Sequence, residues 1–307
     1  MATYLVTQAT GQQSGWVITH LLEAGSKVHA VVRDPTKTLP PILHQPGVTI
    51  FKGDSTDFES IYRAAQGCKG AYLNTFPIPG LEVQQAKTVV EACKKAGVEA
   101  MVGSTTFATG DKTLWDDEMT KESLLHDYYV SKAGVEDAVR SGGFKAYTIV
   151  RPSFIHMNYL LPGVDYNFPE FHVTGELRHP ANDGSRMPHI DESDVAKYVV
   201  AAFQHPEKFN GQELDLINES LTMEEVRDIL EKVSGKKVKV VKRSPEETKD
   251  VISRVMGQRF PVWGNQKDFS KVIAGSKALV EKFGIPYTSL ENSLRRERDR
   301  LLEAFPA

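Results

Sequence analysis

The chain lacks most of the features that mark a specialised class of protein. Its two cysteines, Cys68 and Cys93, are too few for a disulfide framework and lie in patterns typical of helices. We therefore expect a reducing compartment, the cytoplasm. No apolar run approaches the ~20 residues of a membrane-spanning helix, so we expect no membrane partner. A strand pattern already begins at Tyr4, which leaves no room for a signal peptide.

An excess of charge of one sign is also missing, because the formal net charge is only −3. General binding of nucleic acid usually needs a basic face, so we expect no nucleic-acid partner. No two of the nine histidines have the H-x-x-x-H spacing on an expected helix, and no metal site is predicted. The length of 307 residues allows one large domain or a domain with a smaller lobe.

The first half of the chain alternates short apolar runs with helical patterns. The apolar runs are nearly continuous, which is typical of strands that are buried on both faces of a parallel sheet. Repeated strand–helix–strand units predict an α/β fold with a doubly wound sheet. The expected strands are residues 4–6, 28–32, 48–51, 71–73, 100–102 and 147–150, and the expected helices are 17–24, 58–65, 83–96 and 130–141.

The pattern changes after Pro152. Residues 153–190 show little periodicity, and a long irregular segment is usually a binding or lid segment. Thr222 and Glu225 then form a capping-box signature, which predicts the start of a helix. The other elements expected in this half are helices at 193–204, 245–256, 276–283 and 289–302, and strands at 214–217 and 238–241.

The turn between the first strand and the first helix has few glycines. A turn of the form G-x-x-G-x-x-G would have glycine at positions 8, 11 and 14, but this chain has Gln8, Gly11 and Ser14. A strand, a turn and a helix are still the context in which a dinucleotide pyrophosphate is held, because the helix N-terminus offers unpaired N–H groups. The motif indicates a nucleotide-binding fold more firmly than a bound nucleotide.

The end of the second strand has no acidic residue. It has Arg33 instead, with Lys37 nearby, and a guanidinium can bind a 2′-phosphate with two hydrogen bonds, which favours NADP over NAD. An ordinary solvated basic residue is an equal alternative. Asp54, after the third strand, is expected near the adenine or as a turn residue. Asn74 and Thr75 end the fourth strand, at the edge of the sheet where ligands bind.

Tyr128 and Lys132 carry the strongest signal for catalysis. They are four residues apart, so on a helix they share a face. A lysine ammonium lowers the pKa of a neighbouring phenol, and such a tyrosine can donate a proton to a developing alkoxide. Thr105, after the fifth strand, is expected to hydrogen-bond the same oxygen. The alternative is a surface Tyr–Lys pair on an ordinary helix.

Several short motifs, taken together, resemble the NmrA-like branch of the atypical short-chain dehydrogenases/reductases. In chain order they are Ala9-Thr10-Gly11-Gln12-Gln13, Val32-Arg33-Asp34-Pro35, Gly53-Asp54, Ser131-Lys132-Ala133, Val150-Arg151-Pro152 and Met187-Pro188-His189-Ile190-Asp191. The resemblance implies a Rossmann domain over residues 1–152 with a returning segment near 187–218. It implies a smaller substrate-binding lobe over 153–186 and 219–307.

The resemblance also implies NADP(H) as the cofactor. Gly11, Arg33 and Lys37 match the family's cofactor positions, and Lys132 matches its retained active-site lysine. Many members lack the tyrosine, so Tyr128 makes this chain similar to a complete reductase. The full set of expected cofactor-binding residues is Thr10, Gly11, Gln12, Gln13, Arg33, Lys37, Asp54, Asn74, Thr75 and Lys132.

We therefore expect an NADPH-dependent reductase of secondary metabolism that acts on a small, apolar or aromatic carbonyl or conjugated substrate. Tyr128 would be the acid, Lys132 its activator and Thr105 a donor to the substrate oxygen. The expected substrate contacts are Phe154, His156, Asn158, Tyr159 and Phe168. One alternative is a redox sensor that binds NADP(H) and a protein partner, and another is a cofactor-independent isomerase or cyclase. We expect a monomer or a homodimer.

Overall fold

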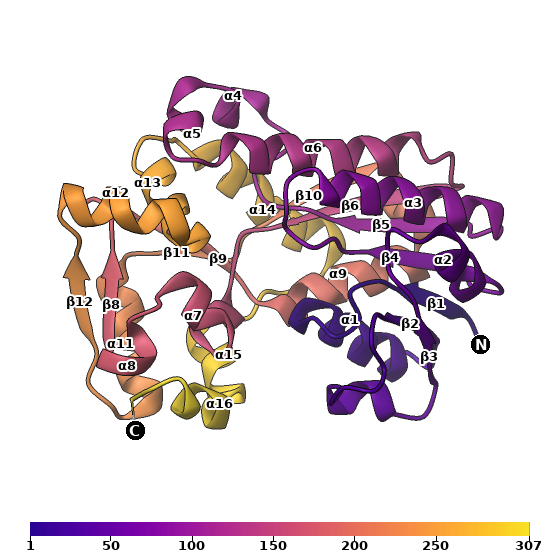
Figure 1. Cartoon of the computed structure of the whole chain (residues 1–307), viewed down its shortest axis with the longest axis horizontal. Helices are drawn as coiled ribbons and strands as arrows, with labels where there is room; N and C mark the ends of the chain where they lie inside the picture. The colour runs from indigo at the N-terminus through magenta and orange to yellow at the C-terminus, as the bar shows by residue number, and fades with distance from the viewer. Residues whose placement is uncertain (307) are drawn as a thin grey trace. The chain divides into compact units, whose positions relative to one another are not determined.

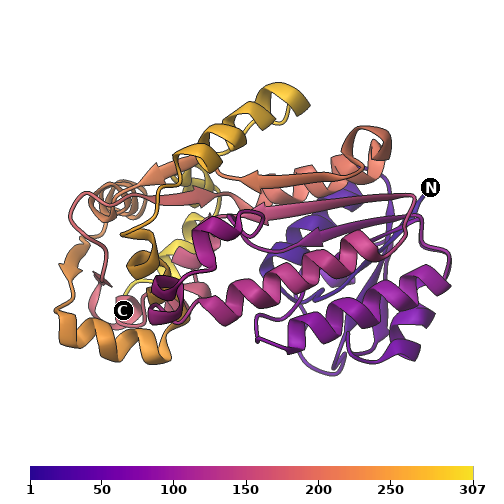
Figure 2. The same ribbon diagram turned by 90° about the horizontal axis from the view of Figure 1, so that it is seen from above.

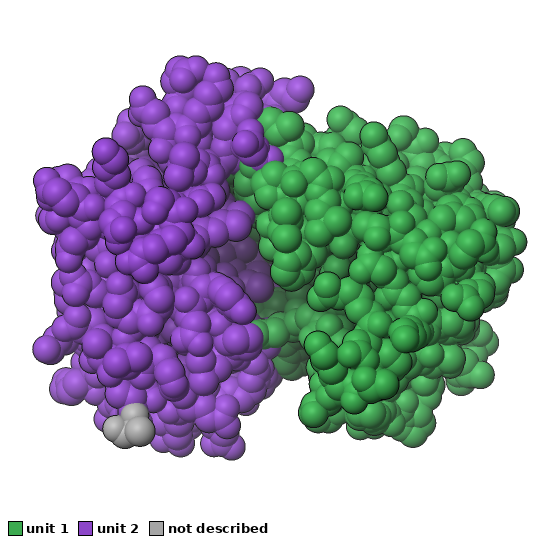
Figure 3. Space-filling model, viewed as in Figure 1, with its two compact units in different colours: residues 1–110, 128–152, 192–215 green, residues 111–127, 153–191, 216–307 purple. Residues whose placement is uncertain are grey.

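The structure is a computed structural model that describes residues 1–306, and these residues fall into two units. Unit 1 comprises residues 1–110, 128–152 and 192–215 (Figure 3). Unit 2 comprises residues 111–127, 153–191 and 216–307. Each unit is thus assembled from segments that are far apart in the chain. Whether the units are a cofactor domain and a substrate lobe stays a prediction.

A seven-stranded sheet in the order β10-β6-β5-β4-β1-β2-β3 forms the framework of unit 1 (Figure 1). All neighbouring pairs from β6 to β3 are parallel. The strands are β1 Thr3–Val6, β2 Lys27–Val32, β3 Val48–Lys52, β4 Gly70–Leu73, β5 Ala100–Ser104, β6 Ala146–Pro152 and β10 Gln212–Leu216. The order runs outward from β1 in both directions, which confirms the predicted doubly wound sheet and places its switch point between β1 and β4.

Helices cover both faces of this sheet. Figure 2 shows α3 and α6 on one side and α9 on the other. A side chain at Gly103 of β5 would meet Val139 of α6 at 2.9 Å, so a glycine is needed there for the helix to lie close. The helices of unit 1 are α1 Gln12–Glu23, η1 Pro41–His44, α2 Phe58–Ala65, α3 Leu81–Lys95, α6 His126–Ser141, α9 Glu192–Gln204 and α10 Pro206–Phe209. The strands and helices predicted for the first half of the chain are confirmed.

Unit 2 contains a three-stranded sheet, β11-β9-β7, and a two-stranded sheet, β12-β8. The strands are β7 Phe154–Ile155, β8 Glu176–His179, β9 Met187–Ile190, β11 Glu219–Leu221 and β12 Lys239–Lys242. The expectation that residues 153–190 are irregular is wrong, because β7, β8, β9 and three short helices lie there. Each has two to five residues, too few to show a period, and pairing partners such as β11 and β12 lie far along the chain.

The predicted helix after Thr222 is confirmed, including both hydrogen bonds of its capping box. The helix expected over residues 289–302 is instead two helices separated at Glu297. The helices of unit 2 are α4 Lys112–Trp115, α5 Glu118–Glu122, η2 His156–Tyr159, α7 Gly163–Asn167, α8 Phe171–Thr174, α11 Met223–Ser234, α12 Pro245–Arg254, η3 Met256–Gln258, α13 Arg259–Gly264, α14 Ser270–Phe283, α15 Leu290–Arg296 and α16 Arg298–Glu303. Within residues 1–306, none of the helices has both the length and the apolar character that crossing a membrane requires.

Candidate active site

The turn between β1 and α1 is tight. The Gly11 amide donates a hydrogen bond to the Gln8 carbonyl at 2.8 Å, and a Cβ at Gly11 would lie 3.1 Å from the same oxygen. Gly11 precedes the first residue of α1 and provides no side chain to cap the helix. The amide end of a twelve-residue helix is therefore open to an anion, as in dinucleotide sites.

The two departures from the glycine pattern have different consequences. Ser14 is fully buried, and its hydroxyl donates to the Thr7 carbonyl at 3.1 Å. The Ser14 side chain therefore stabilises the turn from its buried side and occupies no space on the exposed side of the turn. Gln8 has a φ of 49°, in the left-handed region that favours glycine, and it is partly exposed. Gln8 is thus the departure whose side chain lies at the surface of the turn.

Hydrogen bonds connect the turn to the ends of the neighbouring strands. The Thr7 hydroxyl donates to the Asn74 carbonyl at 2.8 Å and accepts from the Asn74 amide at 2.9 Å, which joins the ends of β1 and β4. The Gln13 side chain donates to the Ser104 hydroxyl at 2.9 Å, which joins the first turn of α1 to the end of β5. These contacts bring candidate cofactor residues together at the carboxyl edge of the sheet, beside its switch point.

The other expected cofactor residues differ in how free their side chains are. Arg33 and Lys37 are exposed, and no described residue forms a hydrogen bond or ion pair with either side chain. The Asp54 carboxylate accepts from the amide and the hydroxyl of Thr56, at 2.9 and 2.7 Å, so it stabilises its own turn. Thr10 is exposed at the start of the β1–α1 turn. All these cofactor roles stay predictions.

Tyr128 and Lys132 share a face of α6, with the ammonium nitrogen of Lys132 5.3 Å from the centre of the Tyr128 ring. Lys132 is 5 % exposed, so the pair is not an ordinary surface pair. The ammonium donates to Oε1 of Glu82 at 2.5 Å. Glu82 lies in the first turn of α3 and is fully buried, and its Oε1 also accepts from the Thr75 hydroxyl at 2.8 Å.

Sequence reasoning missed Glu82. A signal was present, because Glu82 shares its helix face with Ala86, Val89 and Val90, all of which are buried. An acidic residue on an otherwise apolar face needs a buried partner of opposite charge. The sequence could not show that this partner was Lys132, fifty residues away.

Burial is the main reason why Tyr128 stays a phenol. Burial raises the pKa of Tyr128, Lys132 lowers it, Glu82 raises it and a hydrogen bond with Thr106 lowers it. Lys132 thus lowers the pKa of the phenol, as expected, but burial and Glu82 outweigh it and the net pKa lies above the ordinary value. Burial lowers the pKa of Lys132, but Tyr128 and Glu82 outweigh it and hold that pKa above its ordinary value. At neutral pH the site therefore contains a phenol and an ammonium.

Thr105 and Thr106 point in different directions. The Thr105 hydroxyl donates to Oε1 of Glu136 at 2.8 Å, whereas the Thr106 side chain lowers the pKa of Tyr128. The segment continues the pairing of β5 with β6, since the Thr105 amide donates to Val150, so successive side chains alternate. The Thr105 hydroxyl thus bonds Glu136, and its expected hydrogen bond to the substrate oxygen stays a prediction.

Glu136 belongs to a buried ion network that braces this edge of the sheet. The Arg151 guanidinium donates to both carboxylate oxygens of Glu136, at 2.8 and 2.7 Å. Asp215 accepts from the Ala108 amide at 2.7 Å and lies 3.4 Å from the Arg151 guanidinium. The loop that carries Thr105 and Thr106 is thus fixed to β6 and β10.

The expected substrate residues lie in unit 2, where several form an aromatic core. Tyr159 is stacked on Phe168, with ring centres 5.7 Å apart, and the Phe154 ring lies edge-on to Tyr159 at 5.4 Å. Tyr159, Phe168 and His156 are buried, whereas Phe154 and Asn158 are partly exposed. The structure thus gives three of the five a packing role, and substrate contact stays a prediction for all of them.

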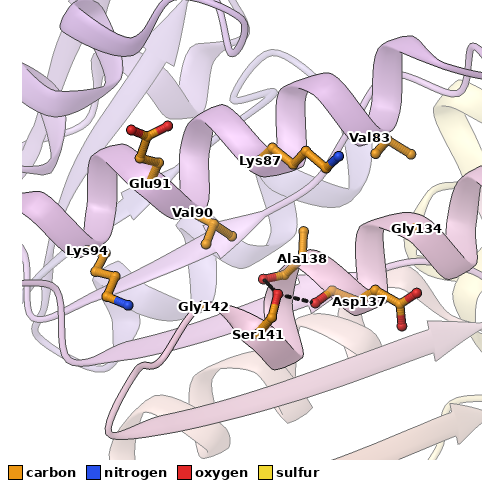
Figure 4. A pocket seen from close by; sticks show the side chains of 10 residues that line it. All are labelled: Val83, Lys87, Val90, Glu91, Lys94, Gly134, Asp137, Ala138, Ser141 and Gly142. Atoms are coloured by element: carbon orange, nitrogen blue, oxygen red, sulfur yellow. Dashed lines mark hydrogen bonds between the residues drawn. The ribbon is translucent and has the colours of Figure 1, made fainter.

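A surface groove runs between α3 and α6 of unit 1 (Figure 4). Apolar and small side chains line it, and lysines and acidic residues border it. It includes none of the expected site residues. The lining residues are Val83, Lys87, Val90, Glu91, Lys94, Gly134, Asp137, Ala138, Ser141 and Gly142.

The parallel doubly wound sheet and the open helix end after β1 define unit 1 as a Rossmann-type nucleotide-binding fold. The chain belongs to the NmrA-like family, whose sequence profile matches residues 2–305. It is 29 % identical over 253 residues to the NmrA-like family domain-containing oxidoreductase FrzB of Cladobotryum sp., covering 76 % of this chain and 73 % of that protein.

Two other proteins extend the comparison. Quinone oxidoreductase 2 of Escherichia coli (strain K12) is 27 % identical over 241 residues, covering 76 % of this chain and 75 % of that protein. Its structure in complex with NADPH has a TM-score of 0.70 at 21 % identity, covering 96 % and 99 % of the two chains. The structure of NmrA, a negative transcriptional regulator, has a TM-score of 0.75 at 21 % identity, covering 97 % of each chain.

Proposed function

We propose that this protein is an NADPH-dependent reductase of a small, apolar or aromatic carbonyl or conjugated compound. One observation carries the proposal: the Tyr128–Lys132 pair and the β1–α1 turn meet at the same edge of the sheet. Thr7 links the turn to Asn74 at the end of β4, and the next residue, Thr75, shares Oε1 of Glu82 with the Lys132 ammonium. A proton donor therefore belongs to the same sheet edge as the expected cofactor site.

The residues of this edge fit the cofactor. The open end of α1 and the small residue Gly11 suit a pyrophosphate, and the exposed guanidinium of Arg33 suits a 2′-phosphate. When bound, NADPH supplies a hydride to the substrate. Tyr128 donates its phenolic proton to the substrate oxygen, and the nearby ammonium of Lys132 stabilises the negative charge that forms.

The names of relatives support this proposal. FrzB is described as an oxidoreductase, and the quinone oxidoreductase was crystallised with NADPH. A second candidate function is dinucleotide sensing, which the likeness to NmrA favours, since that regulator was crystallised with NAD. Gln8 at the surface of the turn also fits a protein that binds dinucleotide without turning it over.

The first test is calorimetry of the purified protein with NADPH and with NADH. We expect tighter binding of NADPH, and Arg33→Ala should reduce the preference by about 10-fold or more, since hydrogen bonds to charged groups contribute roughly 1.5–3 kcal/mol. Arg63→Ala, which removes an exposed arginine from α2, is the matched control. Equal or tighter binding of NADH contradicts the cofactor assignment.

The second test is loss of NADPH absorbance with a panel of quinones and conjugated ketones. Turnover that requires Tyr128 supports a reductase. Tight NADPH binding without turnover of any compound favours the sensor. Conversion of a compound at the same rate with and without NADPH favours the isomerase or cyclase.

A further inference from the structure

Glu82 is the buried acid at the centre of the candidate active site. Its Oε1 accepts two hydrogen bonds, from Lys132 at 2.5 Å and from the Thr75 hydroxyl at 2.8 Å. Its other oxygen, Oε2, is buried and has no hydrogen-bond partner among residues 1–306. The carboxylate is therefore held by one oxygen, and both groups that hold it lie at the sheet edge near Tyr128.

We propose that Glu82 is a positioning residue that fixes the Lys132 ammonium and offsets its charge, so that Tyr128 stays a phenol and acts as a proton donor. This inference rests on the proposed reductase function and deepens it. A lone lysine beside a tyrosine favours the phenolate, which suits removal of a proton from an alcohol. A lysine already paired with a carboxylate leaves the proton on the tyrosine, which suits reduction.

The charged groups around the phenol support this arrangement. Lys132 lies on the same helix face as Tyr128, and Glu82 lies on the neighbouring helix α3. Lys132 lowers the pKa of Tyr128, whereas Glu82 raises it. Glu136, one turn further along α6, also raises the pKa of Lys132 and so stabilises its ammonium form. Thr106, from the loop after β5, lowers the pKa of the phenol. Tyr128 is partly exposed, but its burial is still the largest effect on its pKa and acts in the same direction as Glu82, since a phenolate loses more than a phenol when water is removed.

Glu82→Gln is the informative variant. The amide keeps a carbonyl oxygen at the position of Oε1, where it still accepts from Lys132 and Thr75. Its NH₂ group takes the position of Oε2, where no described donor lies. The change therefore removes the negative charge and keeps the shape of the side chain.

The test is a titration of Tyr128 that needs neither cofactor nor substrate. The absorbance of tyrosinate is measured after rapid pH jumps, and the signal of Tyr128→Phe is subtracted so that the remaining tyrosines cancel. In the unmodified protein we expect Tyr128 to titrate above the ordinary value of about 10. In Glu82→Gln the midpoint should fall by about one pH unit or more, because loss of a nearby negative charge makes the phenolate easier to form.

Glu91→Gln is the matched control, since Glu91 is an exposed acid on the same helix α3. It should leave the Tyr128 midpoint unchanged. Glu82→Asp keeps the charge and should leave the midpoint close to that of the unmodified protein, which separates the effect of charge from that of altered packing.

The inference is overturned if Tyr128 of the unmodified protein titrates at or below the ordinary value. It is also overturned if Glu82→Gln leaves the midpoint unchanged or raises it. If Glu82→Gln does not fold, Glu82→Met, which also removes the charge and keeps a side chain of similar length, is titrated in its place, and a midpoint that does not fall overturns the inference. Failure of NADPH to bind would refute the proposed function without affecting this titration, so the two failures are distinguishable.

Discussion

The chemical role of each residue at the candidate site depends on its neighbours more than on its own residue type. Lys132 lowers the pKa of Tyr128, as expected, but burial of the phenol raises it more, and the Glu82 carboxylate that is paired with Lys132 acts in the same direction as burial. Thr105 and Thr106 differ only in the direction of their side chains. A one-residue step in an extended segment therefore decides which hydroxyl bonds Glu136.

At this scale we predict that Tyr128→Phe lowers turnover by about 10²–10⁴-fold, the usual contribution of one positioned acid. Folding and NADPH affinity should be nearly unchanged, because only a hydroxyl is removed. The measurement is the rate of NADPH oxidation with an identified substrate, beside calorimetry of NADPH binding.

The pH dependence of the unmodified protein is a separate check on Tyr128. Its pKa is raised, so the acid form persists through neutral pH and the proton-donating step should weaken only above about pH 10. Full activity of Tyr128→Phe would remove the phenol from the mechanism.

At the scale of the element, the site depends on how the ends of helices and strands are fixed. The β1–α1 turn is held by the Ser14–Thr7 hydrogen bond and by the links of Thr7 to Asn74 and of Gln13 to Ser104. The Glu82–Lys132 ion pair joins the first turn of α3 to α6. These contacts lie on segments that are far apart in the sequence.

The two departures from the glycine pattern should respond differently to restoration. Gln8→Gly should preserve or tighten NADPH binding and stabilise the fold by about 1 kcal/mol, because the residue has a positive φ. Ser14→Gly should lower stability by about 1–2 kcal/mol, since it removes a buried hydrogen bond and places glycine in a helix. Denaturant unfolding and calorimetry measure both effects, and loss of binding in Gln8→Gly would mean that Gln8 itself holds the ligand or the turn.

The buried ion pair between α3 and α6 gives another prediction at this scale. Lys132→Met alone should destabilise unit 1 by about 3–5 kcal/mol, because Glu82 would remain buried without its partner. The double change Glu82→Met and Lys132→Met should be near neutral, since apolar side chains of similar volume replace both charges. Denaturant unfolding of the unmodified protein, both single variants and the double variant tests this, and a loss in the double variant equal to the sum of the two single losses would show that the pair is not coupled.

At the scale of the whole molecule, the two units differ in what is buried. Both units bury ion pairs, and unit 2 also buries neutral histidines. His189 is fully buried between Tyr159, which it contacts at 2.8 Å, and the Met187 carbonyl at 2.7 Å. His156 is also fully buried, and its nearest carboxylate oxygen, on Asp191, is 4.0 Å away.

The stability of the chain should therefore fall in mild acid. Burial lowers the pKa of His189 to about 4 from an unfolded value of 6.5, and burial, His189 and Arg296 lower that of His156. A lowered histidine pKa gives stability that is present above pH 6.5 and is lost as the pH falls towards 4, because the unfolded chain binds protons that the folded chain does not. The loss from His189 should be about 3 kcal/mol.

Denaturant unfolding between pH 7.5 and about 4 measures this loss. His205→Gln is the control, since His205 is exposed and should leave the pH dependence unchanged. A stability that does not change across this range would contradict the burial of neutral histidines.

The sequence by itself determined the architecture of unit 1. Apolar runs such as 28–32 and helical patterns such as 58–65 are local, so strands and helices followed from residue type and period. The capping box of Thr222 could be predicted for the same reason, because both partners lie within four residues. The motif around Gly11 and the Tyr128–Lys132 spacing likewise located the candidate site, since each is a short-range pattern.

Only the tertiary structure decided what those residues face. The strands of 153–190 form by pairing with β11 and β12, which local patterns do not reveal. Glu82 and Lys132 meet because parallel packing brings α3 beside α6, and Ser14 turns inward because Thr7 lies beneath it. The electrostatic state of Tyr128 depends on burial and on a charge fifty residues away in the chain, and both exist only once the chain has folded.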